Sequence, residues 1–164
     1  MKIKQLLISV ISVAVFSLTH IAFAAAGAVE VKSVAEVDKV TINKDGTKET
    51  KRIPAQKVGP DGEVIYTTTF KNISDKSVGN IVINNPVPEH MRYTIGSAAG
   101  ANTDITFSTD GGKTYSAEDK LSVTTKEGKV RPPAAEEYTN IRWTYKGELA
   151  PAQTGTLTFK AVVK

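Results

Sequence analysis

The segment from Val58 to Tyr93 constrains the fold more than any other part of this chain, because turn and strand signals alternate along it. Pro60, Asp61 and Gly62 are typical of a tight turn, since proline fixes φ at one corner and glycine accepts a positive φ. Residues 64–71 then place larger or core-forming side chains at every second position. A period of two predicts a strand with one buried face, which contains Val64, Tyr66, Thr68 and Phe70.

Further strand signals follow this segment. The polar residues 72–79 are expected to return the chain into a partner strand at Asn80–Asn84, and the prolines of 86–88 to form a corner before a short strand at Tyr93–Ser97. Similar runs recur to the end of the chain, and no window shows a sustained helical period. We therefore expect an all-β sandwich with at most one short helical turn, whose interior contains Tyr66, Phe70, Ile83, Trp143 and Phe159.

Residues 60–93 resemble the conserved extracellular repeat family known as domain of unknown function eleven, here in a single copy. The family's turn and first strand match Pro60–Gly62 and Val64–Asn72, and its next strand and proline corner match Asn80–Ile83 and Asn85–Tyr93. Ile141–Lys164 is similar to its closing hairpin. The resemblance implies an Ig-like antiparallel β-sandwich with Greek-key connections, a fold of bacterial and archaeal surface proteins.

The residues before this sandwich predict an additional strand and hairpin. Val29 and Val31 begin an alternating strand, and Val37–Asn43 form a second run. Asp45 and Gly46 lie between β-rich flanks, which is a strong hairpin signal, and return the chain into Lys48–Ile53. Pro54 is expected to end that strand because proline has no N–H to donate. Residues 25–56 and the sandwich of 57–164 are expected to form one structural unit.

The first 24 residues have the pattern of a cleaved signal peptide. Lys2 and Lys4 precede the apolar run Leu6–Leu18, and Ala22 and Ala24 provide the small residues of a cleavage site. The apolar run is shorter than the roughly 20 residues that a spanning helix needs. We expect export to the periplasm, cell surface or extracellular space, without stable membrane insertion after cleavage.

Composition limits the class of the remaining protein. About 140 residues suffice for one domain. The chain contains no cysteine, so an exported fold must depend on packing and hydrogen bonds. Its formal charge of +4 includes Lys2 and Lys4 of the signal segment, and the remainder is too small and dispersed to indicate nucleic-acid binding.

One short motif has the spacing of an Asp-box hairpin, S-x-D-x-G-x-T-aromatic. In such a hairpin the Asp and hydroxyl side chains accept hydrogen bonds from turn amides, so they are not available for catalysis. We interpret the motif as a structural hairpin and not as a sialidase active site. Its residues are Ser108, Asp110, Gly112, Thr114 and Tyr115.

The sequence contains few groups that are suited to catalysis. His90 is the only histidine after the signal segment, and without cysteine no thiolate is available. Calcium binding uses several loop oxygens, but the spacing of the candidate carboxylates matches no known calcium loop. We expect no enzymatic activity and no cofactor. The four weak calcium candidates are Asp104, Asp110, Glu118 and Asp119.

These observations favour a non-enzymatic structural or adhesive protein of the cell surface or extracellular matrix. Its partner would be a protein, including copies of itself in a homopolymer. The mature N-terminus offers an assembly strand that could add to the sheet edge of a neighbouring subunit. Pairing of this strand within its own sandwich is the favoured alternative. The residues of the strand are Ala25, Val29, Val31 and Ser33.

A second hypothesis is a soluble periplasmic binding module that recognises a carbohydrate or a protein. Loops at the end of a sandwich are common recognition sites, and Ala98–Asp104 and Lys126–Glu137 are the candidates here. Asn72, Ile73 and Ser74 also form an N-x-S sequon, which matters only if the host glycosylates exported proteins.

Overall fold

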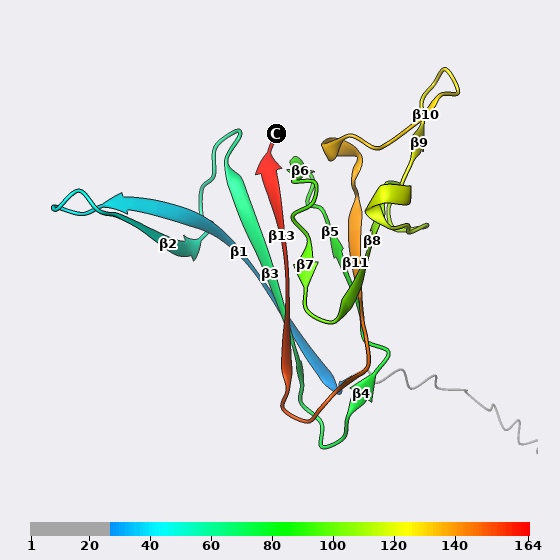
Figure 1. The fold of residues 1–164 in the computed structure, drawn as a ribbon, viewed down its shortest axis with the longest axis horizontal. Helices are drawn as coiled ribbons and strands as arrows, with labels where there is room; N and C mark the ends of the chain where they lie inside the picture. Colours follow the sequence, from blue (N-terminus) through cyan, green and yellow to red (C-terminus); the bar gives the residue numbers. More distant parts are fainter. Residues whose placement is uncertain (1–26) are drawn as a thin grey trace, which may run out of the picture.

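The computed structural model describes residues 27–164, and the predicted all-β sandwich is confirmed. The larger sheet consists of β1 (Val29–Ile42), β2 (Lys48–Pro54), β3 (Glu63–Asn72), β6 (Met91–Tyr93), β7 (Ala99–Gly100) and β13 (Thr154–Val163). The smaller sheet consists of β5 (Val82–Pro86), β8 (Thr103–Ser108) and β11 (Asn140–Tyr145). The strand orders are β2-β1-β3-β13-β6, with β7 also paired to β13, and β5-β11-β8 (Figure 1).

Short elements lie in the connections between these strands. Between the sheets lie β4 (Val78–Gly79) and β12 (Glu148–Leu149), which pair with each other. Between β8 and β11 of the smaller sheet lie β9 (Val123–Thr124) paired with β10 (Val130–Arg131), and the 3-10 helices η1 (Glu118–Lys120) and η2 (Ala135–Glu137). The prediction of at most one short helical turn was therefore wrong, because the structure contains both η1 and η2. Glu137 stabilises η2 by accepting the N–H of Ala134 at 2.6 Å while it also binds Arg131. Within residues 27–164 the structure contains no helix with the length and hydrophobicity of a membrane span.

Two predicted strand pairings are wrong. The strand near Asn80–Asn84 does not pair with β3, because β5 pairs with β11 in the opposite sheet. Ile141–Lys164 does not form a hairpin either, since β11 and β13 belong to different sheets. In both cases the strands carry large apolar side chains at alternate positions, and they bury these side chains face to face. Trp143 and Phe159, for example, meet across the interior with ring centroids 6.2 Å apart.

The strand order departs from that of an immunoglobulin constant domain. In that domain the last strand lies in the sheet that contains the third and sixth strands. Without β2 and the two-residue strands, the order along this chain is β1, β3, β5, β6, β8, β11, β13. Here the last strand, β13, pairs with the second, β3, and the fifth, β8, pairs with the sixth, β11. The fifth and last strands have exchanged sheets.

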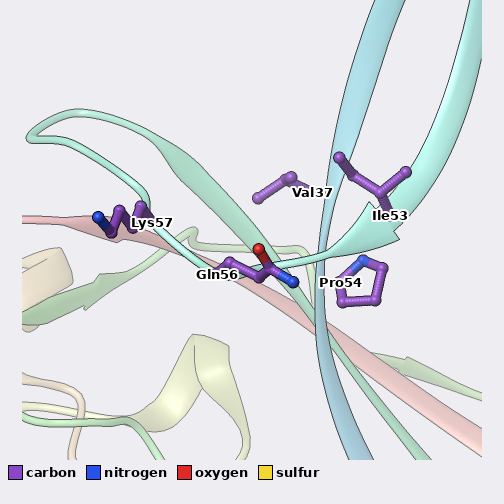
Figure 2. Close-up of a pocket in the computed structure, with 5 residues that line it drawn as sticks. All are labelled: Val37, Ile53, Pro54, Gln56 and Lys57. Carbon is purple, nitrogen blue, oxygen red and sulfur yellow. The ribbon is translucent and has the colours of Figure 1, made fainter.

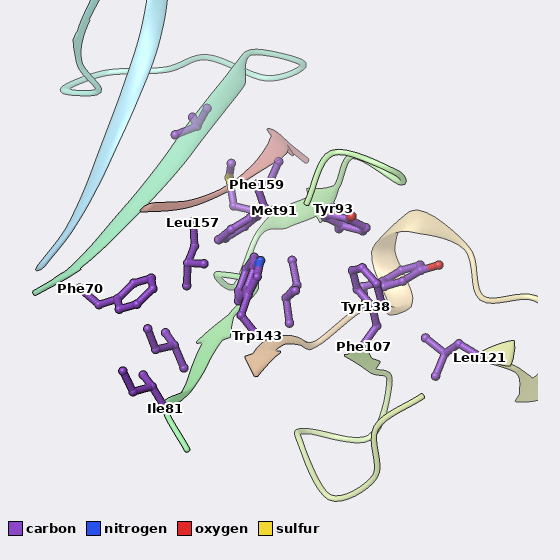
Figure 3. Close-up of a cluster of buried hydrophobic side chains, with 14 of the residues drawn as sticks. Phe70, Ile81, Met91, Tyr93, Phe107, Leu121, Tyr138, Trp143, Leu157 and Phe159 are labelled. Carbon is purple, nitrogen blue, oxygen red and sulfur yellow. The ribbon is translucent and has the colours of Figure 1, made fainter. Parts of the chain in front are cut away.

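Most of the predicted interior residues are buried in one apolar cluster (Figure 3). Phe70, Ile83, Trp143 and Phe159 are buried, whereas Tyr66 is only half-buried. Tyr66 stacks on Phe159 with ring centroids 4.7 Å apart. The tyrosine borders an open hollow of about 200 Å³ beside Ser33 and Asn85. The interior is therefore open to solvent at this point between β1 and β5.

A second group of aromatic rings fills the other end of the interior. Tyr93 lies 5.5 Å from Phe107 and 5.0 Å from Tyr138, measured between ring centroids. Burial raises the pKa of Tyr93 to about 12, although its hydroxyl oxygen accepts the N–H of Ala98 at 3.1 Å. The phenol thus fixes the turn after β6 as well as packing in the core.

The N-terminal strand and hairpin are present, with two differences from the sequence prediction. The two predicted runs are one continuous strand, β1, and β2 ends at Pro54 as expected. In the following turn the positive φ occurs at Asp61 (60°) and not at Gly62. Gly62 is required for another reason, because a methyl group there would overlap the side chain of Val58.

Asn72 ends β3 as a fully buried polar side chain. Its amide nitrogen donates to the carbonyl oxygens of Lys76 (2.7 Å) and Leu149 (2.8 Å), and its oxygen accepts the N–H and hydroxyl of Ser74. Every polar atom of the side chain is used. A glycan at this sequon is therefore incompatible with the folded sandwich.

Candidate functional site

The most distinctive exposed feature is a two-stranded arm that projects from the sandwich, formed by residues 37–54 (Figure 1). β1 pairs with β3 only as far as Glu36, and beyond that residue its pairing is with β2 alone. The arm turns at Asp45, whose carboxylate accepts the N–H (3.0 Å) and hydroxyl (2.6 Å) of Thr47. No second layer covers either face of the arm near its tip, where every residue is exposed.

The two faces of the arm differ in chemistry. One face exposes 57% of Val40 and 67% of Ile42. Because directly paired residues share a face, Thr50 and Lys48 lie beside them on β2. The opposite face pairs Lys39 with Lys51. The arm therefore presents an apolar strip on one side and a basic pair on the other.

A shallow hollow of about 490 Å³ lies at the base of the arm, lined by Val37, Ile53, Pro54, Gln56 and Lys57 (Figure 2). Apart from backbone, its polar groups are one amide and one ammonium group. The ammonium of Lys57 lies on the far side of the hollow from Ile53. The lining contains no carboxylate, hydroxyl or imidazole group, and its larger side chains offer apolar contact area.

The Asp-box residues form the turn that the sequence motif predicts. The hydroxyl of Ser108 donates to Asp110 (2.7 Å), and the hydroxyl of Thr114 donates to the other carboxylate oxygen (2.6 Å). Gly112 occupies a left-handed position with φ 84°. Tyr115 stacks against the guanidinium of Arg142, 3.6 Å from the ring centroid. The motif holds the loop after β8 against β11.

Replacing Asp110 with Asn should lower the melting temperature at pH 7. Hydrogen bonds from Thr114, and then from Ser108 and Lys113, hold the pKa of Asp110 far below its ordinary value. A lowered folded-state pKa stabilises the fold above the unfolded value near 3.9, and this stabilisation is lost as pH falls through the lowered pKa. The gap between wild type and variant should therefore close only in strongly acidic solution. Melting curves from pH 7 downwards test this, with the exposed Asp119→Asn as control; a gap independent of pH would contradict it.

The four calcium candidates do not converge. Asp104 forms an ion pair with Lys146, and Asp110 is bound within its own turn. Glu118 accepts the N–H of Gly96 at 3.3 Å, and Asp119 is exposed on η1. Within residues 27–164, no group of three or more His, Asp or Glu side chains is placed to hold a metal ion.

His90 is exposed in the turn before β6. Its φ of 66° is left-handed, and its carbonyl oxygen accepts the N–H of Lys164 at 2.8 Å. Through its backbone carbonyl, His90 links the turn after the proline corner to the C-terminal residue. The imidazole does not lie in an enclosed pocket.

The predicted assembly strand pairs within its own chain. Val29, Val31 and Ser33 lie opposite Asn72, Phe70 and Thr68 of β3, while Ala25 lies outside the described residues, as does the predicted signal segment. The favoured alternative of pairing inside the same sandwich is thus what the structure contains. Delivery of this strand to a neighbour would require it to leave β3.

The two candidate recognition loops differ in their attachment to the fold. Ala98–Asp104 contains Gly100, where a methyl group would overlap Leu157, so this loop packs against the core. Lys126–Glu137 is more open, and the β9–β10 ribbon at its start exposes 70% of Val130. The first loop exposes only alanine as apolar surface, at Ala99 and Ala101, whereas the second exposes a larger apolar side chain.

The arm was predicted as a hairpin but its projection was not. The sequence of β2 does contain a signal for this projection. Lys48, Lys51 and Arg52 place charges on both faces of the strand and leave no apolar face to bury. No protein-family model matches the chain, and no curated protein is significantly similar to it. The resemblance to the extracellular repeat family therefore stays a prediction.

Proposed function

We propose that this chain is a non-enzymatic, exported structural or adhesive protein of the cell surface or extracellular matrix, and that the arm of residues 37–54 is its main contact element. The observation that supports this proposal most is that Val40 and Ile42 are exposed on the outer part of the hairpin, residues 38–52, where every residue is exposed. Isolated two-stranded hairpins are at best marginally stable in water, and an apolar strip on one favours burial against a partner.

The chemistry of the described residues supports a binding role over a catalytic one. Two of the polar side chains that the sequence singled out, Asp110 and Asn72, are saturated by hydrogen bonds to backbone and hydroxyl groups of the chain. The hollow at the base of the arm provides Val37 and Ile53 for apolar contact. A periplasmic module that binds through Lys126–Glu137 is the second candidate, favoured by the exposure of Val130.

Replacing Val40 and Ile42 together with Thr should reduce assembly or partner binding at least several-fold without unfolding the protein. Threonine keeps the β-branched shape that suits a strand but removes apolar surface. The matched control is Val130→Thr, which removes an exposed valine from the other ribbon. Light scattering and electron microscopy of the purified mature protein measure assembly, and fractionation of cells locates it.

The outcomes separate the candidates. Loss of assembly in the arm variant alone supports the proposal. Loss in Val130→Thr alone favours the binding-module alternative. Monomers at high concentration for the wild type, together with retention of the protein in the cytoplasm, would overturn the proposed function.

A further inference from the structure

The large sheet contains a vacant strand position beside the first half of β1. β2 covers β1 only from Glu36 to Ile42, and the other edge of Val29–Val34 has no strand beside it in the part of the chain that the structure describes. This edge is also apolar on its inner side, where half of Val31 is exposed. An edge of this kind is a template for another strand.

The direction of the backbone groups along this edge follows from two hydrogen bonds. The carbonyl of Ala28 accepts the N–H of Ile73 on the β3 side, whereas the carbonyl of Ala35 accepts the N–H of Ala55 on the opposite side. Because these directions alternate along an antiparallel strand, odd-numbered residues before Ala35 also point their N–H and C=O groups away from β3. These residues are Val29, Val31 and Ser33.

We propose that this edge pairs with the same edge of a second copy of the chain, in antiparallel orientation and with Val31 opposite Val31 of the second copy. A two-fold axis perpendicular to the sheet keeps each face continuous, so only residues whose numbers are both odd or both even lie opposite one another. The inference deepens the proposed function, because it names a second copy as one partner.

This register satisfies the backbone best. Val31 would exchange two bonds with its own counterpart, and Val29 would exchange two with Ser33 of the second copy, in both directions. All outward groups of these three residues are then bonded. A shift by one allowed step pairs Val31 with Ser33 or with Val29, and one odd-numbered residue in each copy loses its partner.

Charge selects the same register. Glu30 and Lys32 lie on the outer face, where their side chains are 44% and 72% exposed. With Val31 at the centre, Glu30 lies opposite Lys32 of the second copy on both sides of the axis. The neighbouring registers place Glu30 opposite Glu30, or Lys32 opposite Lys32, which is destabilising for directly opposed strand residues.

The other free edge near the arm is protected against the same reaction. β2 carries Lys48, Lys51 and Arg52 within five residues, and charged side chains, lysine above all, are a common device against edge pairing. The vacancy beside Val29–Val34 has balanced charge instead. Pro54 and Ala55 limit the vacancy at one end, and the turn at Gly27 limits it at the other.

Crosslinking tests the register directly. The chain has no cysteine, so Val31→Cys introduces a single thiol. In the proposed dimer the two Cα atoms at this position would lie about 5.5 Å apart, within the range of a disulfide. Val34→Cys is the matched control, with 51% exposure against 50% for Val31. Its counterparts would lie about six residues, or roughly 20 Å, apart along the strands.

Charge reversal is the second test, by sedimentation equilibrium on the full mature protein. Glu30→Lys and Lys32→Glu should each weaken the dimer at least tenfold, because each places like charges opposite one another. The double variant should restore dimerisation to within about threefold of the wild type. Thermal melts of each variant confirm that the monomer is folded.

The results distinguish this inference from the proposed function. Crosslinking at residue 31 but not at residue 34, with rescue by the double reversal, supports the dimer. If assembly depends on Val40 and Ile42 but Val31→Cys crosslinks no faster than Val34→Cys, the dimer is wrong and the role of the arm stands. If crosslinking occurs and the arm variant assembles normally, the dimer stands and the role of the arm is wrong.

Discussion

Replacing Trp143 with Ala is expected to lower the free energy of unfolding by about 3–5 kcal/mol. Trp143 is 1% exposed at the centre of β11 and packs against Phe159 of the opposite sheet. Truncation removes apolar contacts from both layers and leaves a cavity that strands fixed on either side cannot close. Urea unfolding followed by circular dichroism measures the change, since the chain has no second tryptophan for fluorescence.

Trp143→Phe is the informative control. The indole nitrogen of Trp143 is buried without a hydrogen-bond partner in the described part of the protein. Phenylalanine therefore loses volume but no hydrogen bond, and it should cost less than half as much as alanine. A loss as large as that of Trp143→Ala would show that the indole N–H is bonded in solution.

Replacing Asn72 with Ala is expected to cost roughly 3 kcal/mol, the second largest effect. The change removes the side-chain partner of the carbonyl of Leu149 and of the N–H of Ser74, and it leaves the carbonyl of Lys76 with the hydroxyl of Ser74 alone. The contact with Leu149 lies within the buried end of the sandwich, where water cannot replace the lost amide. The urea midpoint should fall while the slope of the transition stays unchanged.

Two variants test the cause of this loss. Ile73→Ala changes an exposed neighbour and should stay within about 0.5 kcal/mol of the wild type. Asn72→Asp places a carboxylate against two carbonyl oxygens, which raises its folded-state pKa. Its stability should therefore improve as pH falls, because the protonated acid can donate one hydrogen bond. An Asn72→Asp variant that is least stable in acid would contradict this account.

Alternation along the chain predicted the strands but not their neighbours. Residues 64–70 and 157–161 are predicted to be half-buried strands, and both are strands in the structure, although Ile65 on the predicted solvent face is only 4% exposed. The pattern that buries one face of a strand is the same whether its partner lies beside it or across the interior. The alternation therefore predicts that residues 80–84 lie beside β3 and that β11 lies beside β13. In the structure the two strands of each of these pairs belong to different sheets.

The candidate site was predictable only in part. Asp45 and Gly46 correctly predicted the hairpin turn, and the Asp-box residues correctly predicted theirs, because both depend on local backbone geometry. The projection of the arm depends instead on where β3 stops pairing with β1, at Glu36. The vacant edge beside Val31 depends on where β2 stops pairing with β1, which Pro54 correctly predicts, and on the absence of another strand beside it in the described residues, which no local motif predicts.

The course of β1 and β13 along β3 has a mechanical consequence. Val29 lies opposite Asn72 at one end of β3, and Val162 lies opposite Glu63 at the other. Tension between the two termini would shear both ladders along their length, so that many backbone bonds must rupture together. A molecule tethered by its termini would resist stretching through the middle of its larger sheet, with the load carried by β3.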